Sequence, residues 1–414
     1  MNQSLRIGIV GGSISGVAAA VVLSRLGHDV TILEKSREQL QERGAGLGFE
    51  FSDAELWKRS LNLLDENLVG LPMNRRRWSV KDGNSSLGRP LFEHSVAIRV
   101  HSWGSIYGQL LKRADKARVE RGMAVEKVVS SDAGATVHLV GGARASFDLV
   151  VGADGYQSVV RDGLFPLAEK HYAGYVAWRG TVSEDRLPDI SPLVGVLQTV
   201  GTPLGNALFL MMPGQGGTTE EGSRGVTWLW YEARTPLDML PTELGPDGKL
   251  RPASIPAGRM SPKVLTHLNT TAEEEMPSWH ADLVHRTADP FLQPIYDIRQ
   301  DHYTHKRVCL VGDAASTARP HTGGGASKGI SDAIALADAL HQSASVQEAL
   351  QRYDTERVRR GDELVELGRL IGDDSVLNAP DWHRVERDDM AKWIETGPQT
   401  RAYYYVGPTP ASGS

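Results

Sequence analysis

The chain opens with apolar segments that are interrupted by one glycine-rich turn. Leu5–Val10 is an apolar run that suits a buried parallel strand. It is followed by the turn Gly11-Gly12-Ser13-Ile14-Ser15-Gly16 and then by Val17–Leu26, whose alanine, valine and leucine residues predict a helix. His28–Glu34 predicts a second strand, which ends in an acid. The pattern therefore predicts a strand–helix–strand unit of an α/β fold.

The glycine-rich turn has the spacing of a dinucleotide fingerprint, with Ser13 in place of the middle glycine. Gly11 permits the tight turn, and Gly16 lets the helix pack closely against the strand. The helix N-terminus presents N–H groups and the positive end of its dipole to a pyrophosphate. Glu34 ends the second strand, close to the expected position of an acid that binds a ribose hydroxyl. A glycine turn without a ligand is the alternative, but the strand, helix and terminal acid together favour nucleotide binding.

Two more glycine motifs follow strands later in the chain. The first comes after a predicted hairpin at Gly141-Gly142 and has Asp154-Gly155 near its start. The second follows the buried strand predicted at Arg307–Val311 and begins with Gly312-Asp313. An acid at the carboxyl end of a strand can bind a hydroxylated chain, and a glycine-rich helix start offers amides to an electron-rich group. Either motif alone fits equally well a solvent turn that precedes a capped helix.

The composition limits the classes of function. The chain has 414 residues, 40% of them hydrophobic, and a formal net charge of -6, which excludes wholesale disorder and provides no basic surface for nucleic acid. Its 44 glycines indicate many tight turns or close backbone approaches. The single cysteine, Cys309, excludes an internal disulfide and a multi-cysteine metal site. The uncharged segment Ile7–Ser24 contains four glycines, so it does not fit a membrane span. We expect a cytoplasmic protein without a nucleic-acid or membrane partner.

In this order, the three motifs resemble those of the FAD-dependent aromatic hydroxylases of the p-hydroxybenzoate hydroxylase type, the group A flavoprotein monooxygenases. The segments Ser105–Gly108, Tyr172–Gly180 and Arg319-Pro320-His321 are similar to the 2,6-dihydroxypyridine 3-hydroxylase subgroup, which shares the serine at position 13. Ser316 and Thr322 depart from the residues that are frequent in the wider family, which leaves the exact substrate open. The resemblance implies non-covalent FAD, NADH or NADPH as co-substrate, and no metal.

The resemblance also implies the fold. We expect an α/β protein with a Rossmann-like FAD-binding domain of the GR2, p-hydroxybenzoate hydroxylase type, and an inserted α+β substrate domain built on a mixed sheet. The cofactor motifs bracket this insert, so the two domains would be intertwined rather than consecutive. The predicted limits are 1–73, 99–170 and 299–375 for the FAD-binding domain, 74–98 and 171–298 for the substrate domain, and 376–414 for a C-terminal helix and tail.

Carried over residue by residue, the resemblance assigns the FAD contacts mainly to the three motifs. Glu34 would bind the adenosine ribose, Arg99 the ribityl–phosphate region and Asp154 the pyrophosphate side. Asp313 would bind the ribityl hydroxyls, and backbone amides at the following helix start would face the pyrimidine edge of the flavin. The full set of expected cofactor-binding residues is Gly11, Ser13, Ile14, Ser15, Gly16, Glu34, Lys35, Gly46, Arg99, Asp154, Gly312, Asp313, Gly323, Gly324, Gly325, Ala326 and Ser327.

Beside the flavin, the backbone carbonyl of Pro320 and the side chain of His321 are the expected catalytic groups. An unperturbed imidazole titrates near neutral pH, so His321 is a candidate base for a ring hydroxyl, and a structural hydrogen bond is the equal alternative. Aromatic strand residues are more often plain core, so their contact with substrate is a weaker expectation. The expected substrate contacts are Tyr175, Arg179, Met211, Trp228, Trp230 and His321.

The activity that the resemblance implies is hydroxylation of an electron-rich aromatic ring by a flavin C4a-hydroperoxide, with consumption of NADH or NADPH and O₂. A hydroxypyridine-type N-heteroaromatic is the first expected substrate, and a phenolic or salicylate-type compound is the second. A non-catalytic FAD-binding redox protein would use the same cofactor contacts and stays an alternative. A homodimer is an open alternative for the assembly.

Overall fold

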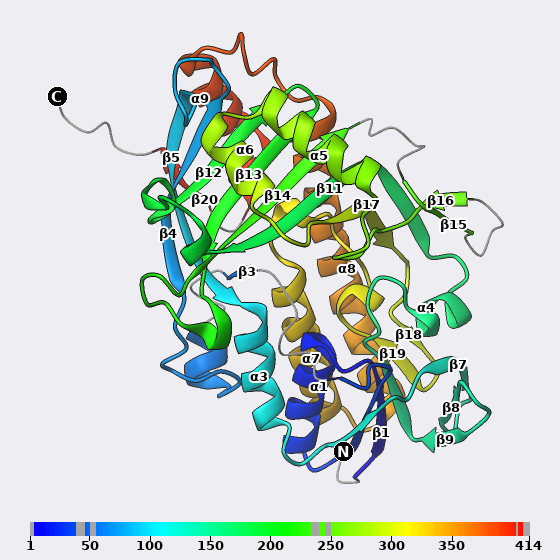
Figure 1. Ribbon diagram of the computed structural model, residues 1–414. Coiled ribbons are helices and arrows are strands. Elements are labelled where there is room, and N and C mark those ends of the chain that lie inside the picture. The colour runs from blue at the N-terminus through cyan, green and yellow to red at the C-terminus, as the bar shows by residue number, and fades with distance from the viewer. Residues whose placement is uncertain are drawn as a thin grey trace.

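The computed structural model describes residues 4–38, 46–49, 55–233, 240–244, 250–402 and 405–408 of the chain. Two large sheets organise this part of the protein, one in the lower half and one in the upper half of Figure 1. Long helices lie below and beside the upper sheet and connect the two halves (Figure 1).

The first sheet is the parallel sheet that the opening pattern predicts. Its strands are β1 (Arg6–Val10), β2 (Asp29–Glu34), β6 (Arg118–Arg121), β10 (Leu149–Gly152), β18 (Thr304–His305) and β19 (Val308–Leu310). They have the order β18–β19–β10–β1–β2–β6, and every neighbouring pair except β18–β19 is parallel. The carboxyl ends of β1, β10 and β19 therefore meet at one edge, and each strand leads into one of the three glycine motifs.

Helices and a smaller sheet surround this core. Helix α1 (Ile14–Arg25) packs against α7 (Gly325–Gln342), which packs in turn against the long α8 (Val346–Gly372). The hairpin predicted at Gly141-Gly142 is confirmed in the antiparallel sheet of β7 (Val125–Ser130), β8 (Ala135–Leu139) and β9 (Arg144–Phe147). The other described helices are α3 (Trp103–Arg113), α4 (Val159–Leu164), α5 (Pro262–Glu275), α6 (Ser278–His285) and α9 (Arg387–Thr396). Short helical turns are η1 (Leu56–Ser60), η2 (Glu184–Arg186), η3 (Ser191–Leu193), η4 (Gln215–Gly217), η6 (Gly312–Ala314), η7 (Pro320–Thr322), η8 (Asp373–Leu377) and η9 (Pro398–Arg401).

The second sheet is mixed, as predicted. It contains β3 (Gly46–Phe49), β4 (Leu71–Val80), β5 (Arg89–Ser102), β11 (Glu169–Ser183), β12 (Val196–Thr202), β13 (Gly205–Met212), β14 (Gly225–Ala233), β17 (Phe291–Arg299) and β20 (Tyr405–Pro408). Their order is β17–β11–β14–β13–β12–β4–β5–β20, with β3 paired to β5, and a separate hairpin joins β15 (Thr242–Leu244) to β16 (Leu250–Pro252). Only β4 and β12 pair in parallel among these described strands. The domain limits stay a prediction. Strands β4 and β5 continue across the expected limits at residues 73 and 99.

Side-chain alternation gives the second sheet two different faces. Trp178, Trp228 and Trp230 share one core with residues of α5 and α6, which lie across the front of the sheet in Figure 1. Tyr175 and Tyr231 belong to a different cluster, because successive residues of a strand point to opposite sides. The second face is the one that is turned toward the glycine motifs.

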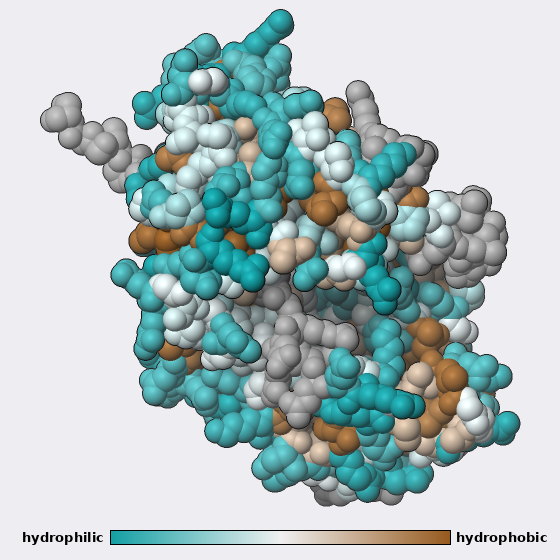
Figure 2. Space-filling model, in the orientation of Figure 1, coloured by the Kyte–Doolittle hydropathy of each residue, from teal (hydrophilic) through white to brown (hydrophobic). Residues whose placement is uncertain are grey.

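The outer surface and the C-terminal segment add little to the site. The face shown in Figure 2 is mostly hydrophilic, and its apolar residues form small separate groups.

Within the described residues, none of the helices combines the length and the apolar character that a bilayer crossing requires. The predicted C-terminal tail contains α9 and, as far as it is described, ends in β20, which pairs with β5 and forms one edge of the second sheet.

We predict that Gly16→Ala destabilises the protein more than Gly27→Ala does. A Cβ on Gly16 would overlap the carbonyl oxygen of Gly11, so the turn between β1 and α1 must move, which costs about 3 kcal/mol or more. Gly27 has a φ of +87° and no heavy atom within 4 Å of an added Cβ, so its substitution costs only backbone strain of about 1–2 kcal/mol. Urea unfolding of the three proteins measures the difference, and equal losses would contradict the close packing of α1 on the turn.

Candidate cofactor and substrate site

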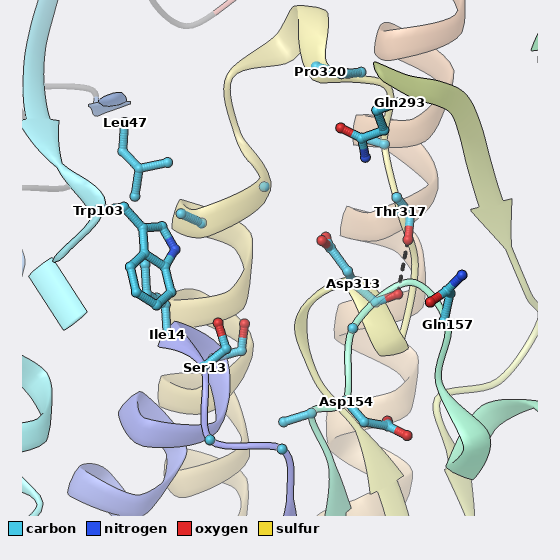
Figure 3. A pocket seen from close by; sticks show the side chains of 18 of the residues that line it. Ser13, Ile14, Leu47, Trp103, Asp154, Gln157, Gln293, Asp313, Thr317 and Pro320 are labelled. Atoms are coloured by element: carbon cyan, nitrogen blue, oxygen red, sulfur yellow. Dashed lines mark hydrogen bonds between the residues drawn. The ribbon is translucent and has the colours of Figure 1, made fainter. Parts of the chain in front are cut away.

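A cavity of about 680 Å³ lies between the carboxyl edge of the first sheet and one face of the second. Figure 3 shows it from close by, with side chains that converge from both sheets and from the start of α7. All three glycine motifs contribute to it, together with β3, α3, β11, β14 and β17. Its lining includes Gly11, Ser13, Ile14, Ser15, Glu34, Lys35, Gly46, Asp154, Arg179, Asp313, Pro320, Gly323, Gly325 and Ala326, all of which the sequence predicted.

At one end, the β1–α1 turn and Glu34 form a pocket for a nucleotide. α1 begins at Ile14, directly after Ser13, so the first N–H groups of the helix open toward the cavity. The Glu34 carboxylate accepts hydrogen bonds from the backbone N–H groups of Gly12 and Ser36, both at 2.7 Å. Each carboxylate oxygen has a second lone pair, so Glu34 is held in place and can still accept a ribose hydroxyl.

Asp154 has a local structural role that the sequence prediction did not include. Its carboxylate accepts hydrogen bonds from the Ser158 hydroxyl at 2.5 Å and from the N–H groups of Val159 and Val160 at 2.8 and 3.3 Å. It therefore binds the N–H groups at the start of α4, while burial raises its pKa. Asp154 still lines the cavity (Figure 3), so its contact with the cofactor stays a prediction.

Asp313 is the acid that the fold leaves open. Its carboxylate points into the cavity (Figure 3), and it has no hydrogen-bond partner among the described residues. Its backbone carbonyl accepts a hydrogen bond from the Thr317 hydroxyl at 2.9 Å, which ties the loop together. Desolvation by the surrounding protein raises the pKa of Asp313, and the nearby Lys328 ammonium opposes that rise.

A buried charge cluster holds the backbone next to Asp313. The Asp332 carboxylate on α7 is fully buried and accepts hydrogen bonds from the Gly312 N–H at 2.9 Å, from Lys328 at 2.7 Å and from Arg357 of α8 at 2.7 Å. Lys328 also donates to the Gly312 carbonyl at 2.9 Å. The position of Asp313 is thereby coupled to the packing of two helices.

The start of α7 closes the same side of the cavity. Gly323 has a φ of +66°, the left-handed conformation that glycine adopts without strain, and it redirects the chain into the helix. Gly323, Gly325 and Ala326 line the cavity, so the N-terminal amides of an 18-residue helix border it. Such amides stabilise negative charge, including charge on the edge of an electron-rich ring.

These residues fit FAD. The cavity combines a helix start with an adjacent acid at its nucleotide end, an open carboxylate at Asp313 and a second helix start at α7. A dinucleotide with a hydroxylated linker and an electron-rich ring needs those groups in that order. An apolar ligand would leave the Asp313 carboxylate without a partner in a desolvated site, which is costly.

Arg179 of β11, Leu229 of β14 and Gln293 of β17 line the same cavity as Pro320, and Gln293 lies near Pro320 in Figure 3. Arg319, in the same loop as Pro320, is buried and paired, because it donates to Asp297 at 2.8 Å and to Asp373 at 2.6 Å. These ion pairs attach the loop to β17 and to η8. The loop that carries Pro320 is therefore positioned by buried charges.

His321 is not the neutral-pH base that an unperturbed imidazole would be. Burial, followed by the positive charges of Arg319, Arg76 and Arg179, lowers its pKa to about 3. Its Nε2 lies 2.7 Å from the Tyr175 hydroxyl, and its ring centroid lies 4.3 Å from that of Tyr231. The structure thus provides the hydrogen bond of the second sequence interpretation, and His321 is neutral at physiological pH.

The structure separates several predicted contacts from the cavity lining. Met211, Trp228 and Trp230 belong to the core on the α5–α6 face of the second sheet, and the indole N–H groups of Trp228 and Trp230 bond to Thr287 and Thr202. Their position in the alternation of β13 and β14 excludes them from the cavity face. Tyr175 is on the correct face, but it is buried beneath His321.

Five predicted cofactor residues contribute through the backbone or through packing instead of lining the cavity: Gly16, Arg99, Gly312, Gly324 and Ser327. The Arg99 guanidinium donates to the carbonyl of Gly70 at 3.1 Å, so it braces a neighbouring segment. A Cβ on Gly312 would meet the Ser15 side chain, and this close approach explains why the first and third motifs need small residues here.

The sequence prediction missed Leu47, Trp103, Gln157, Gln293 and Thr317, which also line the cavity (Figure 3). Trp103 begins α3 and stacks on Tyr107 with ring centroids 5.0 Å apart. Gln157 follows the Asp-Gly motif, so its position in that motif was a usable signal. Gln293 lies on a strand of the second sheet, and nothing local marks it as part of a site.

We predict that Asp313→Asn weakens FAD binding by about 1.5–3 kcal/mol, roughly ten- to hundredfold in Kd, because a charged acceptor of hydroxyl groups is lost. Titration of the apoprotein with FAD, followed by flavin fluorescence, measures the Kd. Asp338→Asn on the exposed side of α7 is the control and should bind FAD like the natural protein. Full affinity in Asp313→Asn would contradict a contact between this carboxylate and the cofactor.

We predict that His321 does not titrate between about pH 5 and about pH 9, since its pKa lies far below this range. Two-dimensional NMR of the imidazole nitrogens, assigned with His321→Asn, measures this directly. His302 serves as the internal control, because its hydrogen bond to Asp354 raises its pKa and its ring is exposed. A His321 resonance that titrates near neutral pH would show that the imidazole is solvated rather than buried.

Comparison with known proteins agrees with this geometry. The description "NAD(P)-binding Rossmann-like domain" matches residues 9–38, "FAD binding domain-like" matches 172–297, and "FAD binding domain" matches 292–367. A 2,6-dihydroxypyridine 3-monooxygenase of Paenarthrobacter nicotinovorans is 29% identical over 360 residues, which cover 86% of this chain and 88% of that protein.

Solved structures show the same fold. A 2,6-dihydroxypyridine-3-hydroxylase from Arthrobacter nicotinovorans has a TM-score of 0.80 at 24% identity, covering 100% of this chain and 99% of that one. A salicylate hydroxylase in complex with substrate has a TM-score of 0.70 at 20% identity, covering 99% and 100% of the two chains. With three glycine motifs around one cavity that fits FAD, the chain is similar in sequence and fold to FAD-binding monooxygenases.

Proposed function

We propose that the protein is an FAD-dependent monooxygenase that consumes NADH or NADPH and hydroxylates an electron-rich aromatic ring, with a hydroxypyridine as the first substrate class. The observation that carries this proposal is one cavity lined both by the three glycine motifs and by residues of the second sheet, such as Arg179 and Gln293. The cofactor part matches FAD, and the remaining part is bordered by a second sheet that contributes no nucleotide motif. That arrangement supports a flavin that faces a separate small molecule.

When bound, FAD supplies the redox chemistry that activates O₂ with electrons from the nicotinamide donor. The protein's own residues bind, orient and exclude water. Asp313 holds the hydroxylated linker, the amides at the start of α7 stabilise charge at the ring edge, and the sheet residues Leu229 and Gln293 cover the far side. The paired Arg319 keeps the Pro320 loop in position, so a ring can be held at a fixed distance from the flavin.

A salicylate-type or other phenolic substrate is the second candidate. The observation in its favour is Arg179, a cation that borders the cavity and suits a carboxylate as well as a ring oxygen. A non-catalytic FAD-binding redox protein would have no need for a substrate space beyond the flavin. The experiment below distinguishes these three functions.

We predict that one aromatic compound accelerates flavin reduction and yields a hydroxylated product. The FAD-loaded protein is mixed anaerobically with NADH or NADPH and with 2,6-dihydroxypyridine, salicylate or p-hydroxybenzoate, and flavin bleaching is followed by stopped flow. Turnover with isotope-labelled O₂ is then analysed by mass spectrometry, and one labelled oxygen atom per product molecule is expected. Flavin reduction that no aromatic compound accelerates, with no labelled product, would overturn the proposal in favour of a redox protein.

A further inference from the structure

The residues on either side of Pro320 both lie against the C-terminal end of α8. Pro320 itself belongs to the turn η7 and lines the cavity (Figure 3). The backbone of Arg319 lies against Gly368, where an added Cβ would stand 3.0 Å from the Arg319 nitrogen and 3.3 Å from its carbonyl oxygen. The ring of His321 lies against Gly372, where an added Cβ would stand 3.0 and 3.1 Å from two ring atoms. Residues four apart in a helix share one side of it, so Gly368 and Gly372 together contact both neighbours of Pro320.

The backbone of Gly372 does not itself require glycine. Its φ of -67° and ψ of -41° are helical, and the residue connects α8 to η8. Alanine is the better helix former, so helix propensity alone would favour alanine at this position. The available space excludes it, because an added Cβ would overlap the hydroxyl oxygen of Tyr175. What requires glycine here is therefore a contact, and that contact leads to the cavity loop.

Tyr175 is too tightly packed to move aside alone. Its side chain is fully buried, and its hydroxyl oxygen lies 2.7 Å from Nε2 of His321. Its ring packs edge-on against that of Tyr231, with the centroids 6.1 Å apart. A Cβ at Gly372 would therefore push the Tyr175 hydroxyl and the His321 ring together. Because His321 directly follows Pro320 in the chain, the displacement would reach the cavity wall.

Ion pairs attach the same loop to the same end of α8. Asp373 follows Gly372 and accepts a hydrogen bond from Arg319 at 2.6 Å. Asp297 of β17 accepts hydrogen bonds from Arg319 at 2.8 Å and from Arg369 of α8 at 2.6 Å. A long arginine side chain has many rotamers, so these pairs alone leave the distance between loop backbone and helix open. The glycine contacts set that distance.

We infer that Gly372, together with Gly368, is a positioning residue that determines how closely Pro320 borders the bound ring. This inference rests on the proposed function, in which flavin and ring substrate meet beside Pro320. Neither glycine is among the residues that line the cavity, so each acts through a neighbour of Pro320. A displaced Pro320 would let the ring bind away from the reactive position. NADH would then be oxidised without hydroxylation, and O₂ would leave as hydrogen peroxide with both electrons.

The test is a double-mutant cycle of Gly372→Ala and Tyr175→Phe in the FAD-loaded protein. Tyr175→Phe removes the oxygen that an added Cβ would overlap, so Gly372→Ala should cost less in that background. Each protein receives NADH or NADPH with 2,6-dihydroxypyridine or salicylate, and the hydroxylated product formed per donor oxidised is measured. We expect Gly372→Ala to lower this ratio by about tenfold in the natural background, and by less than about threefold after Tyr175→Phe.

A second measurement needs no substrate. Two-dimensional NMR of the His321 imidazole nitrogens should show a shift on Gly372→Ala that is smaller in the Tyr175→Phe background. The Kd for FAD should stay within about threefold of the natural value, because the Asp332 cluster holds the cofactor loop independently.

Gly368→Ala is the second variant, in case Gly372→Ala does not fold. Its Cβ would require a shift of only a few tenths of an ångström in the Arg319 backbone, so we expect a folded protein and a loss of about two- to fivefold in the product ratio. The matched control is Gly163→Ala in the short helix α4. Gly163 is exposed and has no heavy atom within 4 Å of an added Cβ, so all measurements should stay unchanged.

Three results would overturn the inference. The first is an unchanged product ratio in Gly372→Ala and Gly368→Ala. The second is an equal loss from Gly372→Ala in both backgrounds, which would assign the cost to the helix instead of the Tyr175 contact. The third is a loss of FAD affinity that parallels the loss of product, which would assign it to the cofactor site.

The outcome also separates this inference from the proposed function. If the natural protein oxidises the donor and hydroxylates no aromatic compound, the monooxygenase proposal fails. The NMR cycle then decides whether Gly372 positions the loop, and equal shifts in both backgrounds would overturn that role. Product formation by the natural protein that is insensitive to both glycines would support the proposed function and contradict the inference.

Discussion

The buried carboxylate of Asp332 is the contact on which the cofactor site depends most. It joins the Gly312 N–H, Lys328 and Arg357, so one side chain connects the end of β19, the helix α7 and the helix α8. A fully buried carboxylate is stable only when it is paired and hydrogen-bonded, and Asp332 accepts three hydrogen bonds, two of them from cations. Because this cluster sits directly behind the third glycine motif, it determines where Asp313 and the start of α7 face the cavity.

The charges along the cavity form a graded series. The Glu34 carboxylate accepts hydrogen bonds from two backbone amides, and the Asp154 carboxylate accepts hydrogen bonds at the start of α4. The Asp313 carboxylate accepts none from the described residues. On the other side, Arg319 is fully paired and Arg179 is not. Charged groups that pair within the protein stabilise its fold. Charged groups without a partner indicate positions where a ligand can bind. The open Asp313 carboxylate, in the turn after β19, fits the hydroxyl groups of a cofactor.

Neutral His321 changes how activation of the ring is understood. A base with a normal imidazole pKa could remove a proton from a ring hydroxyl, but the positive surroundings and burial of His321 prevent this. Positive charges beside a bound ring hydroxyl would lower its pKa and so favour the deprotonated ring.

The sequence by itself determined the three glycine motifs, their order, the parallel sheet and most of the motif residues that line the cavity. Those predictions succeed because each motif is local. A strand, a glycine and an acid within a few residues define a helix start or an exposed carboxylate, whatever the rest of the chain does. The substrate side could not be predicted in the same way. Trp228 and Trp230 looked as suitable as Tyr175, and only the pairing of β13, β14 and β11 shows which face each residue joins. The pKa of His321 and the isolation of Arg179 likewise depend on groups that are far apart in the chain, because desolvation and charge pairing are decided by tertiary neighbours.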